Sequence, residues 1–155
     1  MIGKELFLMH EAYVILPLYS VKTKTVPLRS GLNQWNAEGR IRDKDEVYIP
    51  VPKRIHEKFP FFFPDDSFVL ELPNGQKLSA KLCQAGSKGL MSNPNSALGK
   101  WILRDILKKK PGELVIMSDL YIDSVKITKT SHNYFKIYFS SDYPSYEKFI
   151  NGINV

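Results

Sequence analysis

The chain has 155 residues, a length that fits one domain over residues 1–155 with enough mass to bury a hydrophobic core without disulfides. Hydrophobic residues make up 43% and charged residues 25%, which indicates a globular protein and excludes a disordered or fibrous one. Lys and Arg number 22 against 16 Asp and Glu, and the net charge of +6 favours a polyanionic partner, either nucleic acid or an anionic membrane surface.

Cysteine content and apolar tracts indicate a cytoplasmic protein. Cys83 is the only cysteine, which excludes an internal disulfide and a cysteine-built zinc site and favours a reducing compartment. The longest apolar tract near the start, residues 12–19, is too short to span a membrane and contains Pro17. We therefore expect no membrane segment.

The pattern along the chain is mainly that of β-strands. Short runs rich in β-branched and aromatic residues recur, and several alternate apolar with polar residues, as half-buried antiparallel strands do. Pro17 in the first run predicts an edge strand or a bulge. The predicted strands are residues 13–19, 47–51, 67–72, 77–83, 113–117, 121–128 and 134–139.

One pair of these runs predicts a β-hairpin. Asn74 and Gly75 stand between residues 67–72 and 77–83, and this pair supplies the positive φ angles that a tight turn requires.

Two short helices are predicted. Residues 52–58 begin with Pro52, which the first turn of a helix tolerates. Residues 96–108 have apolar residues at helical spacing, Ser96 as the expected N-cap, and lysines in the last turn. The predicted fold is therefore mainly β, a seven-stranded open β-barrel with two short α-helices.

The residue types of catalytic sites form no recognisable motif. His10, His56 and His132 are far apart and have no acidic or hydroxyl residue at a suggestive spacing. A metal-nuclease motif would begin at Asp65, but the strand that follows offers Glu71 without the lysine that the motif requires. Glycine-rich phosphate loops and nucleophile elbows are missing from the sequence as well. We expect no catalysis by this chain and no metal or cofactor.

Two long polar segments remain to be explained. Residues 28–43 hold three arginines, three amide side chains and Trp35, and residues 84–96 are rich in amides, hydroxyls and glycine. Loops of this length are uncommon in compact domains and are usually functional or disordered. Arg, Asn and Gln match base edges in the major groove, while Ser, Lys and backbone N–H groups suit phosphates. A barrel with two such arms can hold double-stranded DNA between them.

At these segments the sequence resembles a known family. SGLNQWNAEGR (residues 30–40), EVYIPVP (46–52) and LMSNPNSALGKWIL (90–103) resemble the C-terminal DNA-binding domain of NgoFVII-type restriction endonucleases. That domain is similar to the plant "B-three" domain and to the effector domains of BfiI and EcoRII, which share a DNA-binding pseudobarrel. The resemblance covers residues 13–139.

The resemblance implies a fold and a mode of binding. An N-arm and a C-arm grip the major groove and read a short site; here they correspond to residues 28–43 and residues 84–95. It also implies a nuclease domain of phospholipase-D type elsewhere in the parent protein, possibly an ATPase subunit as a further partner, and a monomeric effector.

The candidate DNA-binding residues are the polar side chains of the two arms. The arginines suit guanine or phosphate, the amides suit base edges, and the hydroxyls and the lysine suit the DNA backbone. Trp35 either touches a thymine methyl or a sugar or anchors the arm, and Asp43 and Glu38 either accept from cytosine or hold the arginines. The candidates are Arg29, Ser30, Asn33, Gln34, Trp35, Asn36, Arg40, Arg42, Asp43, Gln84, Ser87, Lys88, Met91, Ser92, Asn93 and Asn95.

Three other classes of function fit less well. A membrane-surface module needs a basic amphipathic face, whereas the one lysine run, residues 108–110, fits a helix C-terminus. A protein-interaction barrel explains the loops but not their bias towards arginine and amides. A single-strand binder needs exposed aromatic residues among the basic ones, and the arms hold only Trp35. Recognition of duplex DNA is the function we predict.

Overall fold

The computed structural model describes residues 12–153, so that His10 lies outside the described part. Its strands are β1 (Ala12–Pro17), β2 (Ile49–Pro50), β3 (Phe68–Glu71), β4 (Lys77–Cys83), β5 (Gly89–Asn93), β6 (Ser124–Ser131) and β7 (Tyr134–Tyr138). Its helices are the 3-10 helix η1 (Gly31–Asn36), α2 (Lys53–Lys58), α3 (Ser96–Gly99), the π-helix η2 (Lys100–Ile106), the 3-10 helix η3 (Met117–Asp119) and α4 (Tyr146–Gly152).

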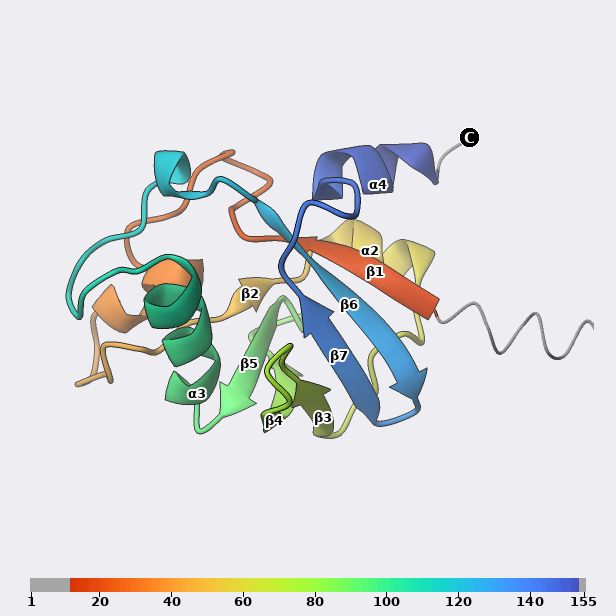
Figure 1. Cartoon of the computed structure of the whole chain (residues 1–155), viewed down its shortest axis with the longest axis horizontal. Coiled ribbons are helices and arrows are strands. Elements are labelled where there is room, and N and C mark those ends of the chain that lie inside the picture. Colours follow the sequence, from red (N-terminus) through yellow and green to blue (C-terminus); the bar gives the residue numbers. More distant parts are fainter. Residues whose placement is uncertain (1–11, 154–155) are drawn as a thin grey trace, which may run out of the picture.

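The strands form one sheet of seven, in the order β1-β6-β7-β3-β4-β5-β2. Every pair is antiparallel except β3 with β7, which is parallel. The two edge strands, β1 and β2, come back into contact and nearly close the sheet (Figure 1). The predicted fold class is confirmed: the protein is a mainly β, barrel-like structure with a few short helices.

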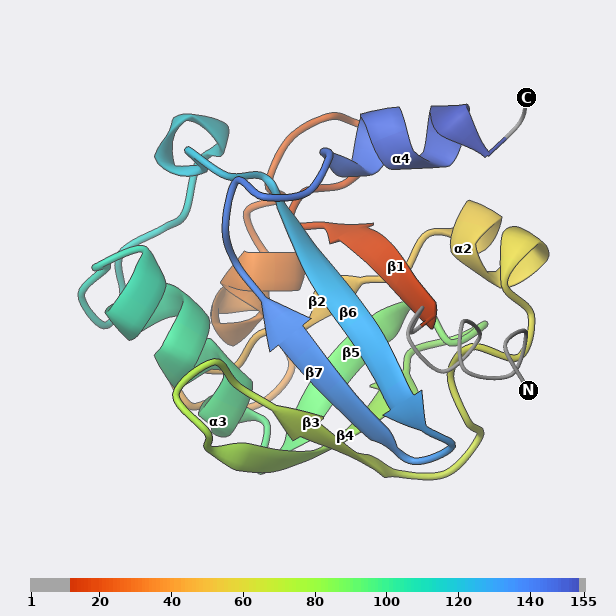
Figure 2. The ribbon, with the colours of Figure 1, turned by 45° about the vertical axis from the view of Figure 1, so that its right-hand side comes forward.

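Helices cover opposite sides of the barrel. In both ribbon views, α4 and α2 lie on the side of β1, whereas α3 lies on the other side (Figure 2). Tyr146, Phe149 and Ile150 of α4 are buried, and the ring of Phe149 packs 5.6 Å from that of Tyr13. Burial of this apolar face explains why so short a helix is stable.

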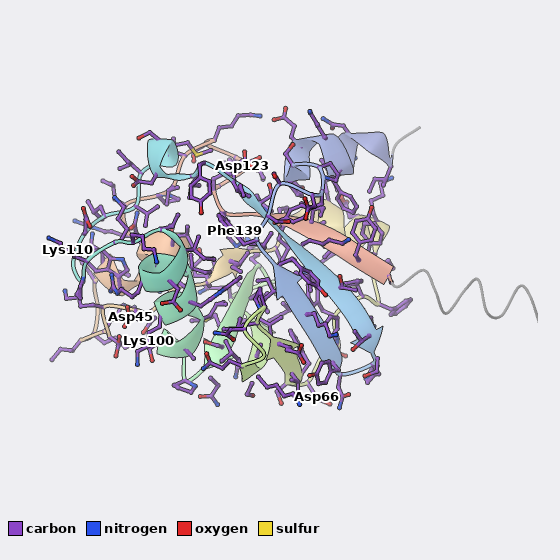
Figure 3. All side chains as sticks on the ribbon, in the orientation of Figure 1. Asp45, Asp66, Lys100, Lys110, Asp123 and Phe139 are labelled. Atoms are coloured by element: carbon purple, nitrogen blue, oxygen red, sulfur yellow. The ribbon has the colours of Figure 1, made fainter. Side chains whose placement is uncertain are left out.

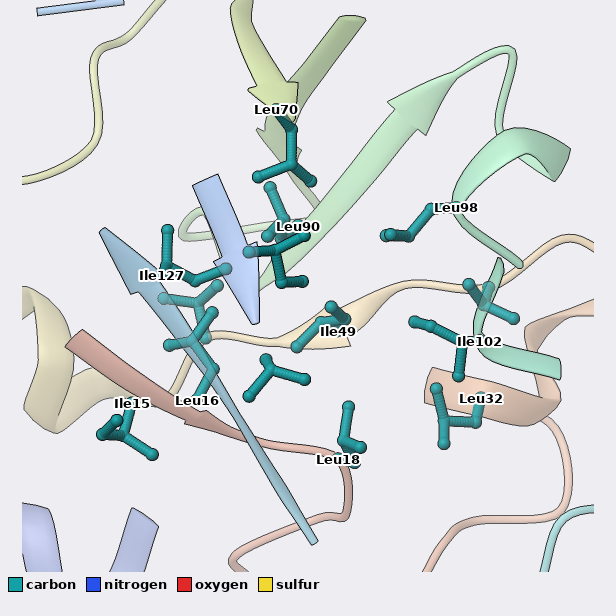
Figure 4. Close-up of a cluster of buried hydrophobic side chains, with 14 of the residues drawn as sticks. Ile15, Leu16, Leu18, Leu32, Ile49, Leu70, Leu90, Leu98, Ile102 and Ile127 are labelled. Carbon is teal, nitrogen blue, oxygen red and sulfur yellow. The ribbon is translucent and has the colours of Figure 1, made fainter. Parts of the chain in front are cut away.

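The core fills the inside of the barrel with aliphatic side chains. Ile15 and Leu16 of β1 and Ile127 of β6 are fully buried, and Leu70 and Leu90 pack against them from the facing strands (Figure 4). Leu32 and Ile102 lie at one end of this core, where the segment after β1 meets the helix that starts at α3. The start of the predicted N-arm is thus packed into the barrel.

The hairpin prediction is confirmed, and one strand prediction is wrong. Strands β3 and β4 pair antiparallel on either side of the Asn74–Gly75 turn, and Gly75 has a φ of +89°. Residues 113–117, predicted as a strand, form none. Glu113 and Ile116 are exposed, and the backbone N–H and carbonyl of the buried Val115 bond to the Asn33 side chain in place of a neighbouring strand.

Two short elements were not predicted. Strand β5 lies in the middle of the segment interpreted as a loop, and its pairing with β4 overrides a composition rich in glycine, serine and asparagine. Helix α4 near the end of the chain was also missed.

The predicted helices exist with different details. The helix expected at residues 96–108 consists of α3 followed by a π-helical segment, and it begins after Asn95, so the prediction of Ser96 as N-cap is wrong. Helix α2 begins at Lys53, with Pro52 as the N-cap residue. Between residues 12 and 153 none of the helices is long and apolar enough to span a membrane.

Candidate nucleic-acid interface

A buried amide fixes the N-arm, residues 28–43, to the barrel. Asn33 is fully buried, and its Nδ2 donates to the carbonyl oxygens of Pro27 and Val115 at 2.8 and 2.9 Å. Its Oδ1 accepts from the backbone N–H of Val115 at 2.9 Å. Both ends of the amide are therefore satisfied inside the protein, and this contact network gives Asn33 a structural role.

Trp35 is a second anchor of the N-arm. Its side chain belongs to the hydrophobic core and is 6% exposed, and the ammonium of Lys44 lies 5.2 Å from the centre of the ring. Of the two roles expected for Trp35, its burial supports that of a hydrophobic anchor.

Glu46 gathers two of the predicted arginines. Its carboxylate is 1% exposed and accepts from Nη2 of Arg40 at 3.0 and 3.2 Å and from Nη1 of Arg42 at 2.6 Å. A buried carboxylate needs such partners, since an unpaired charge is strongly disfavoured in the interior. Arg42, 13% exposed, is therefore a structural residue, whereas Arg40 is 54% exposed and also presents a face to solvent.

The same carboxylate reaches the far end of the second predicted arm. Nδ2 of Asn95 donates to Oε1 of Glu46 at 2.9 Å. Asn95 lies two residues after the end of β5, so the contact ties the segment between β5 and α3 to the stretch that follows the N-arm. The amide of Asn95 positions an arm here.

The stretch that follows the N-arm packs on the helix that starts at α3. A Cβ atom built on Gly99 would lie 1.6 Å from the carbonyl oxygen of Asp45, so the two backbones meet in direct contact at this point. Arg104 holds the same place, with Nη2 2.6 Å from Oδ1 of Asp45 and 3.0 Å from the carbonyl oxygen of Lys44. In Figure 3, Asp45 lies beside the helix, near Lys100.

The predicted C-arm, residues 84–95, is not a long loop. Strand β5 pairs with β4 over its whole length, which leaves a tight turn at residues 84–88 and a short bend after Asn93. Gln84, Gly86 and Ser87 have φ angles of +76°, +76° and +57°, so the chain reverses within a few residues. Strand β5 therefore places Ser87 and Lys88 at one end of the sheet and Asn93 and Asn95 at the other.

Along β5 the predicted contacts separate further. Ser92 is 4% exposed, and its Oγ donates to the carbonyl oxygen of Pro94 at 2.8 Å and accepts from the N–H of Leu98 at 2.9 Å, so this hydroxyl is engaged inside the protein. Met91 is half-buried in the middle of the strand. Asn93 is exposed but shares a hollow with Asp65 and Asp66, whose carboxylates repel phosphates.

A cavity of about 660 Å³ opens where the turn of the second arm approaches the start of the N-arm. Four segments contribute to its wall: the loop after β1, the start of the N-arm, β2 with the first turn of α2, and the turn between β4 and β5. The lining is mostly apolar. Its apolar part includes Leu18, Tyr19, Val21, Pro27, Tyr48 and Pro50.

The charge around this cavity is positive. Lys22, Lys53 and Lys88 belong to its lining, and none of the described lining residues is acidic. Within residues 12–153 the three ammonium groups take part in none of the ion pairs, which elsewhere engage Lys24 and Lys109. Burial raises the pKa of Tyr19 to about 12, with a smaller contribution from the Asp123 carboxylate, so this phenol adds no negative charge at neutral pH.

Two contacts shape the wall of the cavity. Nε2 of His56 lies 2.9 Å from the carbonyl oxygen of Ser87. Its N–H donates to this oxygen, and the hydrogen bond ties α2 to the turn between β4 and β5. Gly89 leaves room for an aromatic ring: a Cβ at this position would lie 2.7 Å from Cδ1 of Tyr48. The Tyr48 ring therefore lies directly on the backbone of β5.

The other predicted residues of the N-arm lie at or near the surface. Arg29 and Glu38 form an exposed ion pair at 3.0 Å, so Glu38 holds an arginine, one of its two expected roles. Asp43 accepts from the backbone N–H of Asp45 at 2.8 Å and shapes the loop. Asn36 is exposed and donates to the carbonyl oxygen of Leu28 at 3.0 Å, and Gln34 is half-buried.

The structure brings only some of the predicted residues together. The cavity gathers Ser30 and Lys88 with the neighbouring Ser87, and the Glu46 cluster gathers Arg40, Arg42 and Asn95. Sequence reasoning did not identify Lys22, Glu46, Tyr48, Lys53 and His56 as parts of these sites. A signal existed for Glu46 and Tyr48, which stand in the EVYIPVP segment, but nothing in the sequence pairs Glu46 with arginines.

Comparisons with known proteins identify the fold family. Residues 10–134 match the model of the NgoFVII C-terminal B3-like DNA-binding domain. A solved structure of a hypothetical protein from Arabidopsis thaliana is similar to 87% of this chain and 96% of its own, with 12% sequence identity and a TM-score of 0.38. No curated protein sequence matches the chain.

Proposed function

Since the chain belongs to the family of the NgoFVII C-terminal B3-like DNA-binding domain, we propose that it is the sequence-specific recognition part of a restriction endonuclease. In this proposal it reads a short site in the major groove of double-stranded DNA with its two arms and carries out no catalysis. The nuclease domain belongs to the parent protein, with an ATPase subunit as a further possible partner.

The observation that carries the proposal is the clustering, between the arms, of cations that form no ion pair within the described residues 12–153. Lys22, Lys53 and Lys88 come from three separate segments and meet at one cavity with no acidic residue in its described lining. Sequence-independent affinity for DNA rests on such ammonium groups, which neutralise phosphates and release counterions. A face of this kind suits a duplex lying across the cavity.

The readers of bases come from the exposed polar residues beside these lysines. Ser30, Gln84 and Ser87 stand at or next to the cavity, and Arg29 lies beside Ser30. Amide and guanidinium groups present the paired donors and acceptors that base edges require. Arg42 and Asn95 act indirectly in this proposal, because their contacts with Glu46 hold the arms in place.

The test is a binding titration of the chain against a library of random duplexes, with sequencing of the bound fraction, at two salt concentrations. We expect one short motif to be enriched and the affinity to fall steeply as salt rises. The Lys88→Gln variant should reduce the slope of log K against log salt by about 1. Lys77→Gln, at the opposite end of β4, is the matched control and should leave the slope unchanged.

Two other results would point elsewhere. If the sequences of the bound duplexes stay random, the chain binds DNA without recognising a sequence. Binding to anionic vesicles in place of duplexes would indicate an anionic-surface module, the alternative that the positive charge also allows.

A further inference from the structure

The cavity between the arms is more than a charged surface, because its interior is apolar. We propose that it receives one nucleobase swung out of the duplex, with the flanking phosphates held by the lysines at its rim. The inference rests on the proposed function and deepens it. Contacts in the major groove do not occupy this cavity, and the inference assigns a ligand to it.

Size and composition of the cavity fit such a ligand. Its volume of about 660 Å³ lies within the range of sites that hold small molecules, roughly 300–1,000 Å³. Contacts with base edges in the major groove are made mainly by polar side chains and need no deep apolar hollow. An unstacked base presents two apolar faces and a polar edge, which match a mostly apolar wall with a few hydroxyl groups, such as those of Ser20 and Ser30.

Tyr48 supplies a face on which a base can stack. Its ring lines the cavity and is half-buried. The ring rests against Gly89, where any Cβ would lie 2.7 Å from Cδ1 of Tyr48, so its position is fixed by the backbone of β5. Aromatic side chains held in this way are the usual platform for unstacked bases.

The charges determine which kind of ligand enters. Lys22, Lys53 and Lys88 come from three separate segments of the lining, and the described lining has no carboxylate to oppose them. The ligand is therefore anionic at its edge and apolar inside. A nucleotide within a DNA strand has this distribution, with a phosphate on each side of a planar base.

The rim is held in place before DNA arrives. The hydrogen bond of 2.9 Å between His56 and the carbonyl oxygen of Ser87 joins α2 to the turn that carries Lys88. A preformed cavity stabilises the displaced base without first having to order its own walls.

Mismatches in the target test the inference. Unpairing and unstacking a base costs free energy, and the cost is smallest for a mismatched base. In duplexes that carry the selected motif, or a fixed sequence if no motif emerges, a mismatch is placed at each position in turn. We expect one position at which the mismatch raises affinity by about tenfold, since the cost of flipping has been removed there. At the same position 2-aminopurine should change its fluorescence on binding.

Two variants connect that position with the cavity. Tyr48→Ala removes the stacking face and Val21→Trp fills the space, and both should reduce the gain at the mismatch to roughly twofold or less. Tyr121→Ala is the matched control, because Tyr121 is an exposed tyrosine that does not line the cavity. Circular dichroism shows whether each variant is folded.

The outcomes separate this inference from the proposed function. If binding is sequence-specific and salt-dependent but every mismatch weakens the complex, the flipped base is refuted and the proposed function stands. A gain that persists in both cavity variants also overturns the inference, because the base then goes elsewhere. If no duplex binds, the proposed function and the flipped base fail together.

Discussion

Nδ2 of Asn95 lies 2.9 Å from Oε1 of Glu46, and this hydrogen bond joins the segment between β5 and α3 to the stretch that follows the N-arm. The same carboxylate holds Arg40 and Arg42. Glu46 has no proposed contact with DNA, but it sets the position of three residues that were predicted to contact DNA: Arg40, Arg42 and Asn95.

Removing the charge of Glu46 should destabilise the fold. We expect Glu46→Gln to lower the free energy of unfolding by about 3 kcal/mol, because the Arg42 guanidinium is left nearly buried without its counter-charge. Urea denaturation at neutral pH measures the change. Glu38→Gln is the control: its ion pair with Arg29 is exposed on both sides, and its loss should cost about 0.5 kcal/mol or less. Equal effects of the two variants would show that burial does not matter here.

Asn33 should prove to be structural. Asn33→Ala leaves buried backbone groups of Val115 without partners and should cost about 3 kcal/mol of stability. Binding by the folded fraction should be unchanged, measured by titration well below the melting temperature. Asn36→Ala loses one exposed hydrogen bond and serves as the control for stability alone. A loss of affinity without loss of stability would restore Asn33 as a reader.

Gly99 should tolerate no side chain. A methyl group there meets the carbonyl oxygen of Asp45 at 1.6 Å, so Gly99→Ala must separate the helix from the stretch that follows the N-arm and should cost about 3 kcal/mol or more. Gly152→Ala in α4 meets no atom within 4 Å and should be neutral or slightly stabilising. Thermal melts of the two variants make the comparison, and similar melting temperatures would contradict the close approach.

Arg40 is the arginine of the Glu46 cluster whose side chain is partly exposed and can still contact DNA. We expect Arg40→Ala to weaken specific binding by about 1 to 3 kcal/mol. Its effect on stability should be smaller than that of Glu46→Gln, because Arg42 and Asn95 still satisfy the carboxylate. Titration against the selected duplex measures the affinity, with Lys136→Ala on β7 as the control. Unchanged affinity would limit Arg40 to a structural role.

Asp119 should make stability depend on pH. The backbone N–H of Ile116, and after it the ammonium of Lys109, hold the pKa of Asp119 below its usual value. A carboxyl with a lowered pKa stabilises the fold at neutral pH, and this contribution disappears as pH falls below about 4. Asp119→Asn should therefore be less stable than the native chain at pH 7, and the difference should shrink steadily as pH falls below about 4. A constant difference across that range would contradict the assignment, and Asp66→Asn, exposed on a loop, is the control.

Local signals predicted the fold well, while the site required contacts between distant residues. The Asn74–Gly75 turn and the alternation of residues 134–139 act over a few residues, and the hairpin and β7 appeared where they were predicted. Asn33, by contrast, is satisfied by Val115, 82 residues further on. The polar composition of the arms therefore gave no means to tell a buried amide from one that faces DNA.

Strand β5 also depends on a contact between segments that composition does not predict. Its residues favour a loop by composition, and only the partner strand β4 makes them a strand. One continuous C-arm thus became two separate groups of residues, and the cavity between the arms could not be foreseen because four segments build it.

The open edges of the sheet have a consequence for the behaviour of the protein in concentrated solution. The edge strands are β1 and β2, and each contains a proline, Pro17 and Pro50. Proline lacks the N–H group that a strand from another molecule would need as a donor, and prolines at sheet edges discourage aggregation for this reason. The gap between β1 and β2 can therefore stay incompletely closed, because its edges do not offer a template on which further copies of the chain can pair as strands.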